Sequence, residues 1–250
     1  PRRSLRSNNQ TKRTKIALFG IFGVQNLGNE CVLQAMIHNI RERLPEAELY
    51  GICYQPQDTL ARHGLTAVPI RAQYSRDAES GQLPRSRSKL ARLFRILFIR
   101  VPGELLGWFK AFRVLWGTDM VAMTGTGMLT DYSTSSFGYP YDVFKWTIAA
   151  RLAGCKVRFV GIGVGPIYER LSRYFIKSAL SVADYRSYRD NFSKTRLENL
   201  GFDTGKDPVF PDLAFSLPRC FFPECSNHHR QQRVVGVGVM NYFDPHAAGQ

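Results

Sequence analysis

Three short glycine-containing segments carry the residue types from which a binding or catalytic site can be built. Each follows an apolar run: residues 20–30 read GIFGVQNLGNE, residues 124–133 read TGTGMLTDYS and residues 161–166 read GIGVGP. Glycines placed after a strand let backbone N–H groups approach an anion such as a phosphate or a carboxylate. The first segment has neither the GxGxxG spacing of a dinucleotide site nor a Walker loop, so neither is predicted.

The first segment combines backbone freedom at Gly23 and Gly28 with polar side chains at Asn26, Asn29 and Glu30. It lies between a predicted strand and a predicted helix, where α/β sheets bind ligands. These residues therefore predict one wall of a ligand site. The alternative interpretation is a tight turn that ends in a helix cap.

The second segment places Gly125 and Gly127 before Asp131, in a loop rich in Ser, Thr and Tyr hydroxyls. A carboxylate in such a loop can act as a general acid or base when its surroundings raise its pKa. The alternative is an aspartate that caps a turn through its own backbone.

The third segment contributes Gly163 and Gly165, and four arginines follow it. Guanidinium groups bind phosphates and carboxylates through two parallel hydrogen bonds, which suits an anionic substrate. The alternative is a set of local ion pairs. The four arginines are Arg170, Arg173, Arg186 and Arg189.

An alternation of strands and helices must position these segments. Short apolar runs predict strands at 15–20, 49–54, 66–70, 119–124, 156–161 and 185–188, and extended chain at 208–210 and 213–217. Helical periodicity predicts helices over 28–44, 141–153, 172–182 and 191–200, with a weak helix between the second and third strands. This order predicts an α/β fold: a Rossmann-like parallel sheet flanked by helices.

The composition is that of a globular protein, with 44% hydrophobic and 22% charged residues among 250. It excludes collagen-like and wholly disordered chains. No apolar run reaches about 18 residues, so no membrane-spanning helix is predicted. The five cysteines are an odd number and three lie in apolar runs, which indicates buried thiols in a reducing, cytoplasmic compartment.

The formal net charge of +14 is concentrated in two stretches. Residues 1–15 hold six basic residues and no acid, and we expect 1–14 to be a disordered tail. Residues 82–113 hold eight basic residues against Glu104. Within 85–116 the basic residues alternate with Leu, Phe, Ile and Trp at helical spacing, and Pro102 divides the segment into two helices.

Two interpretations of the 85–116 insertion stay open. It is either a core-packing helical unit with a solvated basic face, or an amphipathic unit that lies on an anionic membrane surface. Nucleic-acid binding is not predicted, because no recognition motif accompanies the charge.

A domain boundary is expected near the C-terminal end. We interpret 15–217 as one domain, 218–232 as a Pro-rich linker and 233–250 as the start of a second α/β domain that is cut off at residue 250. The cysteine and histidine spacing in the linker fits no standard zinc finger, so neither a metal nor a cofactor is predicted.

The ordered set of motifs resembles the polysaccharide pyruvyl transferase family. The similar stretches are KIALFGIFGVQNLGNECVLQAMIHNIRERLP, TDMVAMTGTGMLTD, GIGVGPI, YRSYRDNFSKTRLENLG and FPDLAFSLP, in family order over roughly residues 15–240. Two positions depart from the family pattern: Asn29 stands where aspartate is usual, and Thr126 where the middle glycine of a Gly-Gly-Gly loop is usual.

The resemblance implies a two-domain fold similar to GT-B glycosyltransferases and transfer of a pyruvyl group from phosphoenolpyruvate to the hydroxyls of a sugar or lipid-linked oligosaccharide. It implies that Asp131 acts in acid–base chemistry or acceptor positioning and that Arg189 binds phosphoenolpyruvate. Gly23, Asn26, Gly28 and Asn29 would shape the acceptor side. This piece alone would be inactive without the second domain.

Two other functions remain open from the sequence. A glycosyltransferase would use a nucleotide-sugar on the same architecture, and a non-catalytic member would serve as a scaffold in polysaccharide assembly. For the pyruvyl transferase, we expect a cytoplasmic protein that lies at the inner face of the cytoplasmic membrane through residues 85–116.

Overall fold

The computed structural model describes residues 13–24, 26–71, 101–132 and 134–222. Their strands form one parallel sheet of six, in the order β3-β2-β1-β4-β5-β6. The strands are β1 (Lys15–Phe19), β2 (Glu48–Cys53), β3 (Ala67–Pro69), β4 (Met120–Met123), β5 (Lys156–Ile162) and β6 (Tyr185–Tyr188). The predicted α/β class with a parallel sheet is confirmed.

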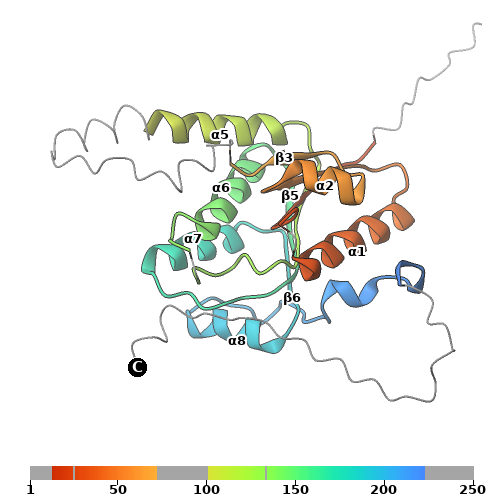
Figure 1. Ribbon diagram of the computed structural model, residues 1–250. Helices are drawn as coiled ribbons and strands as arrows, with labels where there is room; N and C mark the ends of the chain where they lie inside the picture. The colour runs from red at the N-terminus through yellow and green to blue at the C-terminus, as the bar shows by residue number, and fades with distance from the viewer. Residues whose placement is uncertain (1–12, 25, 72–100, 133, 223–250) are drawn as a thin grey trace, which may run out of the picture.

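Helices cover both faces of this sheet. Figure 1 shows α1 and α2 on one side of it and α5, α6 and α7 on the other, with α8 below. The helices are α1 (Leu27–Arg43), α2 (Pro56–His63), α5 (Val101–Leu115), α6 (Tyr139–Leu152), α7 (Arg170–Ser181) and α8 (Asn191–Asn199), followed by the 3-10 helices η2 (Leu213–Ser216) and η3 (Arg219–Phe221). The sheet is therefore a doubly wound one.

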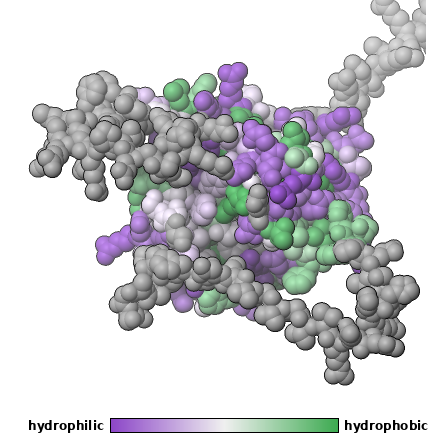
Figure 2. Space-filling view, viewed as in Figure 1, coloured by the Kyte–Doolittle hydropathy of each residue, from purple (hydrophilic) through white to green (hydrophobic). Residues whose placement is uncertain are grey.

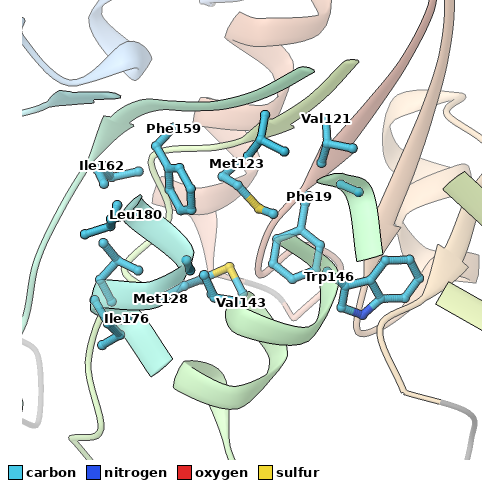
Figure 3. Packing of buried hydrophobic residues seen from close by; sticks show 14 of the residues in the cluster. Phe19, Val121, Met123, Met128, Val143, Trp146, Phe159, Ile162, Ile176 and Leu180 are labelled. Carbon is cyan, nitrogen blue, oxygen red and sulfur yellow. The ribbon is translucent and has the colours of Figure 1, made fainter. Parts of the chain in front are cut away.

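Alternate residues of the strands build two separate cores. On β1, Ile16 and Leu18 pack in a cluster with Leu33 of α1, while Phe19 belongs to the larger cluster on the opposite face. Figure 3 shows that larger cluster, in which Phe19 lies beside Trp146 of α6, with the ring centroids 6.1 Å apart. Because side chains on a strand alternate between faces, a strand segment buried on both faces is apolar at every position, as residues 16–19 of β1 are.

One predicted stretch of extended chain is wrong. Residues 213–216 form η2 instead, because the carboxylate of Asp212 accepts a hydrogen bond from the N–H of Ala214 at 3.0 Å and starts a helical turn, and only Leu217 keeps extended backbone. The neighbouring prediction is confirmed in part, since Val209 makes an isolated parallel bridge with Tyr188 of β6.

Several sequence predictions fall outside the described residues. They are residues 1–12 of the expected tail, residues 85–100 of the basic insertion, and residues 223–250 with the proposed second domain. Helix α5 begins at Val101, so Pro102 and Gly103 lie in its first turn, where proline is tolerated.

The surface mixes polar and apolar side chains. Figure 2 shows hydrophobic surface gathered at the lower right, over the C-terminal 3-10 helices, where Phe215, Phe221 and Phe222 are exposed. Among the described helices, none combines the length and the apolar character needed to cross a membrane.

Candidate functional site

The strand order locates the edge at which a ligand is expected. The chain winds outward from β1 in one direction and from β4 in the other, so the connections that follow these two strands leave on opposite faces. Open parallel sheets bind ligands outside the carboxyl ends of the strands at this switch point. The first and second glycine segments, which follow β1 and β4, both lie here.

Backbone hydrogen bonds join the first segment to the second. The N–H of Thr124 donates to the carbonyl of Phe19 at 3.0 Å, and the N–H of Ile21 donates to the hydroxyl of Thr126 at 3.3 Å. Thr126 is buried. Its hydroxyl therefore connects the two loops through a hydrogen bond. A glycine at this position could not make that bond.

The second segment is joined in the same way to the third. Gly165 donates its N–H to the carbonyl of Leu129 at 3.0 Å, and the hydroxyl of Thr130 donates to the carbonyl of Pro166 at 2.7 Å. A side chain at Gly165 would lie 2.7 Å from Thr130, so only glycine allows this approach. The structure thus brings all three predicted segments to one edge of the sheet.

Asp131 connects the second segment to the residues that precede α7 through hydrogen bonds. Its Oδ1 accepts the N–H of Tyr168 at 2.9 Å, and its Oδ2 accepts those of Tyr168 and Glu169 at 3.1 and 2.8 Å. The side chain is buried. Both carboxylate oxygens therefore hold backbone groups in the structure.

Arg189 lies directly over the third segment. The backbone N–H of Arg189 donates to the carbonyl of Ile162 at 3.1 Å. A Cβ added at Gly163 would lie 2.5–2.8 Å from three atoms of the Arg189 guanidinium. The side chain is 40% exposed and only loosely paired, at 3.5 Å from Asp190 and 3.4 Å from Asp212. This exposed, loosely paired guanidinium is available to an incoming anion.

The other arginines have different surroundings. Arg186 pairs with the carboxylate of Asp207 through Nε and a second nitrogen at 2.9 and 3.1 Å, so it is a structural ion pair. Arg173 donates to the carbonyls of Ile167 and Tyr168 in the loop that precedes α7. Arg170 begins α7 and is exposed.

The predicted acceptor-side residues begin α1. Asn26 is the N-cap of this helix and accepts the N–H of Asn29 at 3.4 Å, as the capping interpretation predicts, and both Asn26 and Gly28 are exposed. In the second segment Gly125 is buried and Gly127 is exposed.

A buried pair under the first segment was missed by the sequence analysis. Glu30 accepts the N–H of Gly23 at 2.9 Å with one oxygen, while its other oxygen lies 2.8 Å from Nε2 of His63. The other ring nitrogen of His63 lies 2.8 Å from the amide oxygen of Gln34. The His63 and Glu30 side chains are only 6% and 8% exposed. Thirty-three residues separate them, and only the packing of α2 against α1 brings them together.

A second buried network, also missed, lies at the carboxyl ends of β2 and β3. Asp142, in the first turn of α6, accepts hydrogen bonds from the Tyr54 hydroxyl at 2.6 Å and from the Arg71 guanidinium at 2.9 Å. Burial raises the pKa of Asp142, and Arg71 and Tyr54 oppose that rise. The network ties three connections at this edge into one rigid unit.

Asp190 caps α8, and this cap gives a pH-dependent prediction. Its carboxylate accepts the N–H of Ser193 at 2.6 Å. Burial alone would raise the pKa of Asp190, but the bonds from Ser193 and the charge of Arg189 bring it below its usual value. A depressed pKa stabilises the fold above the unfolded-state pKa, and this contribution disappears as the pH falls through the folded-state value.

We expect Asp190→Ala to lower the free energy of unfolding by about 1 kcal/mol at pH 7. The difference from wild type should shrink below about pH 4, the ordinary range of an aspartate. Urea denaturation at pH 7 and pH 3 measures it, with Asp190→Asn as the uncharged capping control. A deficit that is the same at both pH values would contradict the assignment.

Among the residues that the structure describes, no group of three or more His, Cys, Asp or Glu side chains is arranged to hold a metal ion. Three of the cysteine and histidine residues of the 218–232 linker, Cys225, His228 and His229, lie outside them.

These features define a doubly wound α/β domain with glycine loops and a partly exposed arginine at the carboxyl ends of its strands, the edge at which open parallel sheets bind ligands. The chain belongs to the polysaccharide pyruvyl transferase family, whose model matches residues 26–232. The matched part begins after β1 and Gly23 and includes the second and third glycine segments. No curated protein gives a significant match.

Proposed function

We propose that the protein transfers a pyruvyl group from phosphoenolpyruvate to two hydroxyls of a sugar, forming a ketal. The observation that supports this most directly is the partly exposed Arg189 guanidinium, which lies over Gly163 at the carboxyl ends of β5 and β6. Family membership supports the general activity, transfer to a polysaccharide acceptor.

The proposed reaction defines what the site must supply. Protonation of the methylene carbon of phosphoenolpyruvate creates an oxocarbenium-like centre at the neighbouring carbon. Two sugar hydroxyls form bonds to that carbon, and its bond to the phosphate oxygen breaks. Of the two hydroxyl protons, one replaces the proton given to the methyl group and the other leaves with phosphate. The site needs proton transfer and cations for two anionic groups.

Arg189 and Asp131 have different proposed roles. Arg189 binds the phosphate or carboxylate of phosphoenolpyruvate. Asp131 holds the second and third segments in register through its backbone hydrogen bonds to Tyr168 and Glu169, and thereby positions the acceptor. Of the two roles predicted for it, positioning accounts better for a carboxylate whose oxygens both accept backbone hydrogens.

The first test is the binding of phosphoenolpyruvate to the full-length protein, measured by calorimetry and thermal shift. Arg189→Ala removes a charge-assisted contact and is expected to weaken binding about 10- to 100-fold. Gly163→Ala keeps the arginine, but its new methyl group displaces the guanidinium, so a similar direction and about tenfold weakening are expected.

Gly103→Ala is the matched control, because a Cβ there meets nothing within 4 Å. It should bind like wild type. If Arg189→Ala and Gly163→Ala both bind phosphoenolpyruvate as tightly as wild type, Arg189 does not bind this ligand. Stabilisation by a UDP-sugar alone would move the protein to the nucleotide-sugar glycosyltransferases, and no binding to either would favour a scaffold.

We further propose that the acceptor is lipid-linked, that the protein works at the inner face of the cytoplasmic membrane, and that a second domain completes a GT-B-like fold. Transfer assays that compare a free sugar with its lipid-linked form test the acceptor. A preference for the free sugar would contradict the proposal.

A further inference from the structure

Helix α5 is apolar on two sides, and among the residues that the structure describes only one of them packs against the sheet. Its inner side buries Ala111 and Leu115 against the core, and the indole of Trp108 donates to the Tyr141 hydroxyl at 3.0 Å. A helix on the surface of a sheet needs one apolar stripe to pack. The outer side therefore requires a separate explanation.

Large apolar side chains project from that outer side. They are 59–69% exposed. Spacings of three and four residues within the helix, and of seven residues to the last of the four, place them on one side of it. They are Leu105, Leu106 and Phe109, with Trp116 directly after the helix end. We call these four residues the α5 outer face.

The charges around the α5 outer face are positive. Lys110 and Arg113 are exposed on the same side. The acid of this helix, Glu104, is exposed but directed toward α6: it accepts the Tyr141 hydroxyl at 2.9 Å and lies 3.7 Å from Nζ of Lys145.

We propose that the α5 outer face docks on the surface of a membrane that contains anionic lipids. Leu, Phe and Trp side chains enter the boundary between headgroups and acyl chains, while neighbouring cations bind the anionic headgroups. The 15-residue helix, about 22 Å long, would lie in the plane of the interface.

Charge favours this occupant over a second copy of the chain. A symmetric dimer through the α5 outer face would bring Lys110 and Arg113 of both copies together without a facing acid, and like charges at an interface oppose association. The contact between Glu104 and Tyr141, at the start of α6, also places the N-terminal end of α5 toward the edge that carries the glycine loops. Docking would bring that edge near the membrane, where a lipid-linked acceptor is found.

The test is flotation of the full-length protein with vesicles of phosphatidylcholine, with and without 30% phosphatidylglycerol. We expect binding to the anionic vesicles that weakens at high salt. The double variant Leu105→Gln/Phe109→Gln should bind about tenfold more weakly or worse, since it removes two inserted side chains. Phe215→Gln is the matched control, because Phe215 is 85% exposed but lies outside α5.

Absence of binding to anionic vesicles at low salt would overturn the proposal. So would equal binding by the wild type and the double variant, which would place the contact elsewhere. If sedimentation shows a dimer that the double variant dissociates, the face is an interface between copies. Circular dichroism checks that the exposed substitutions leave the fold intact. The readout is independent of catalysis, so its failure leaves the proposed transfer reaction untouched.

Discussion

Replacing Gly125 with alanine is expected to lower the free energy of unfolding by about 2–3 kcal/mol, whereas the same change at Gly127 should cost less than about 0.5 kcal/mol. The two glycines occupy one loop, two residues apart. A Cβ at Gly125 would lie 2.4 Å from the carbonyl oxygen of Gly161, while one at Gly127 meets nothing within 4 Å. Urea denaturation of the three proteins measures the difference.

The obstacle at Gly125 is backbone, which makes the cost hard to avoid. Gly161 cannot simply move away, because its φ is +57° and its own Cα faces the side chain of Leu213 from η2. The bond from its N–H to the hydroxyl of Ser187, at 2.9 Å, fixes it to β6 as well. Equal costs at Gly125 and Gly127 would show that β5 relaxes and that this packing is not rigid.

The elements of the fold were predictable because each is determined locally. Strands such as β1 are buried on both faces and read as unbroken apolar runs, and helices such as α1 show helical spacing in their buried residues. The segment 213–216 was predicted wrongly because its helical turn depends on one capping contact from Asp212 rather than on a periodic pattern.

The candidate site was predictable only at the level of loops. That the three glycine segments meet follows from parallel strands, whose carboxyl ends share an edge. Which arginine could bind an anionic ligand did not follow from the sequence, because Arg186 and Arg189 are only three residues apart. The fold shows that Arg186 forms an ion pair with Asp207, whereas Arg189 lies over Gly163. Pairs such as Glu30 and His63 come from separate helices and leave no pattern in a single sequence.

Thr126, which stands where the family usually has a glycine, has a structural role that the sequence did not suggest. A side chain in the middle of a glycine loop can restrict the approach of a ligand to the backbone. In the structure the hydroxyl is instead buried and accepts the N–H of Ile21, so the side chain is directed toward the first segment. The loop keeps exposed backbone at Gly127.

Replacing His63 with alanine is expected to lower the free energy of unfolding by about 2–3 kcal/mol, because it leaves a buried carboxylate oxygen of Glu30 without its partner. His63→Gln should recover part of this loss, since an amide N–H can still donate to that oxygen. His38→Ala is the matched control. His38 is partly exposed on α1 and packs edge-on against Phe221, with the ring centroids 5.7 Å apart. Its loss should lower the free energy of unfolding by less than about 1 kcal/mol.

The same variants separate a local effect on the first segment from a general loss of stability. Glu30 holds the N–H of Gly23, whose φ of +73° and close approach to the carbonyl of Gln55 fix the shape of the loop. If His63 orients Glu30, hydrogen exchange at the Gly23 amide should accelerate in His63→Ala beyond what the change in global stability predicts, and His63→Gln should slow it again. Exchange that follows global stability alone would mean that His63 stabilises the packing of α2 without controlling the loop.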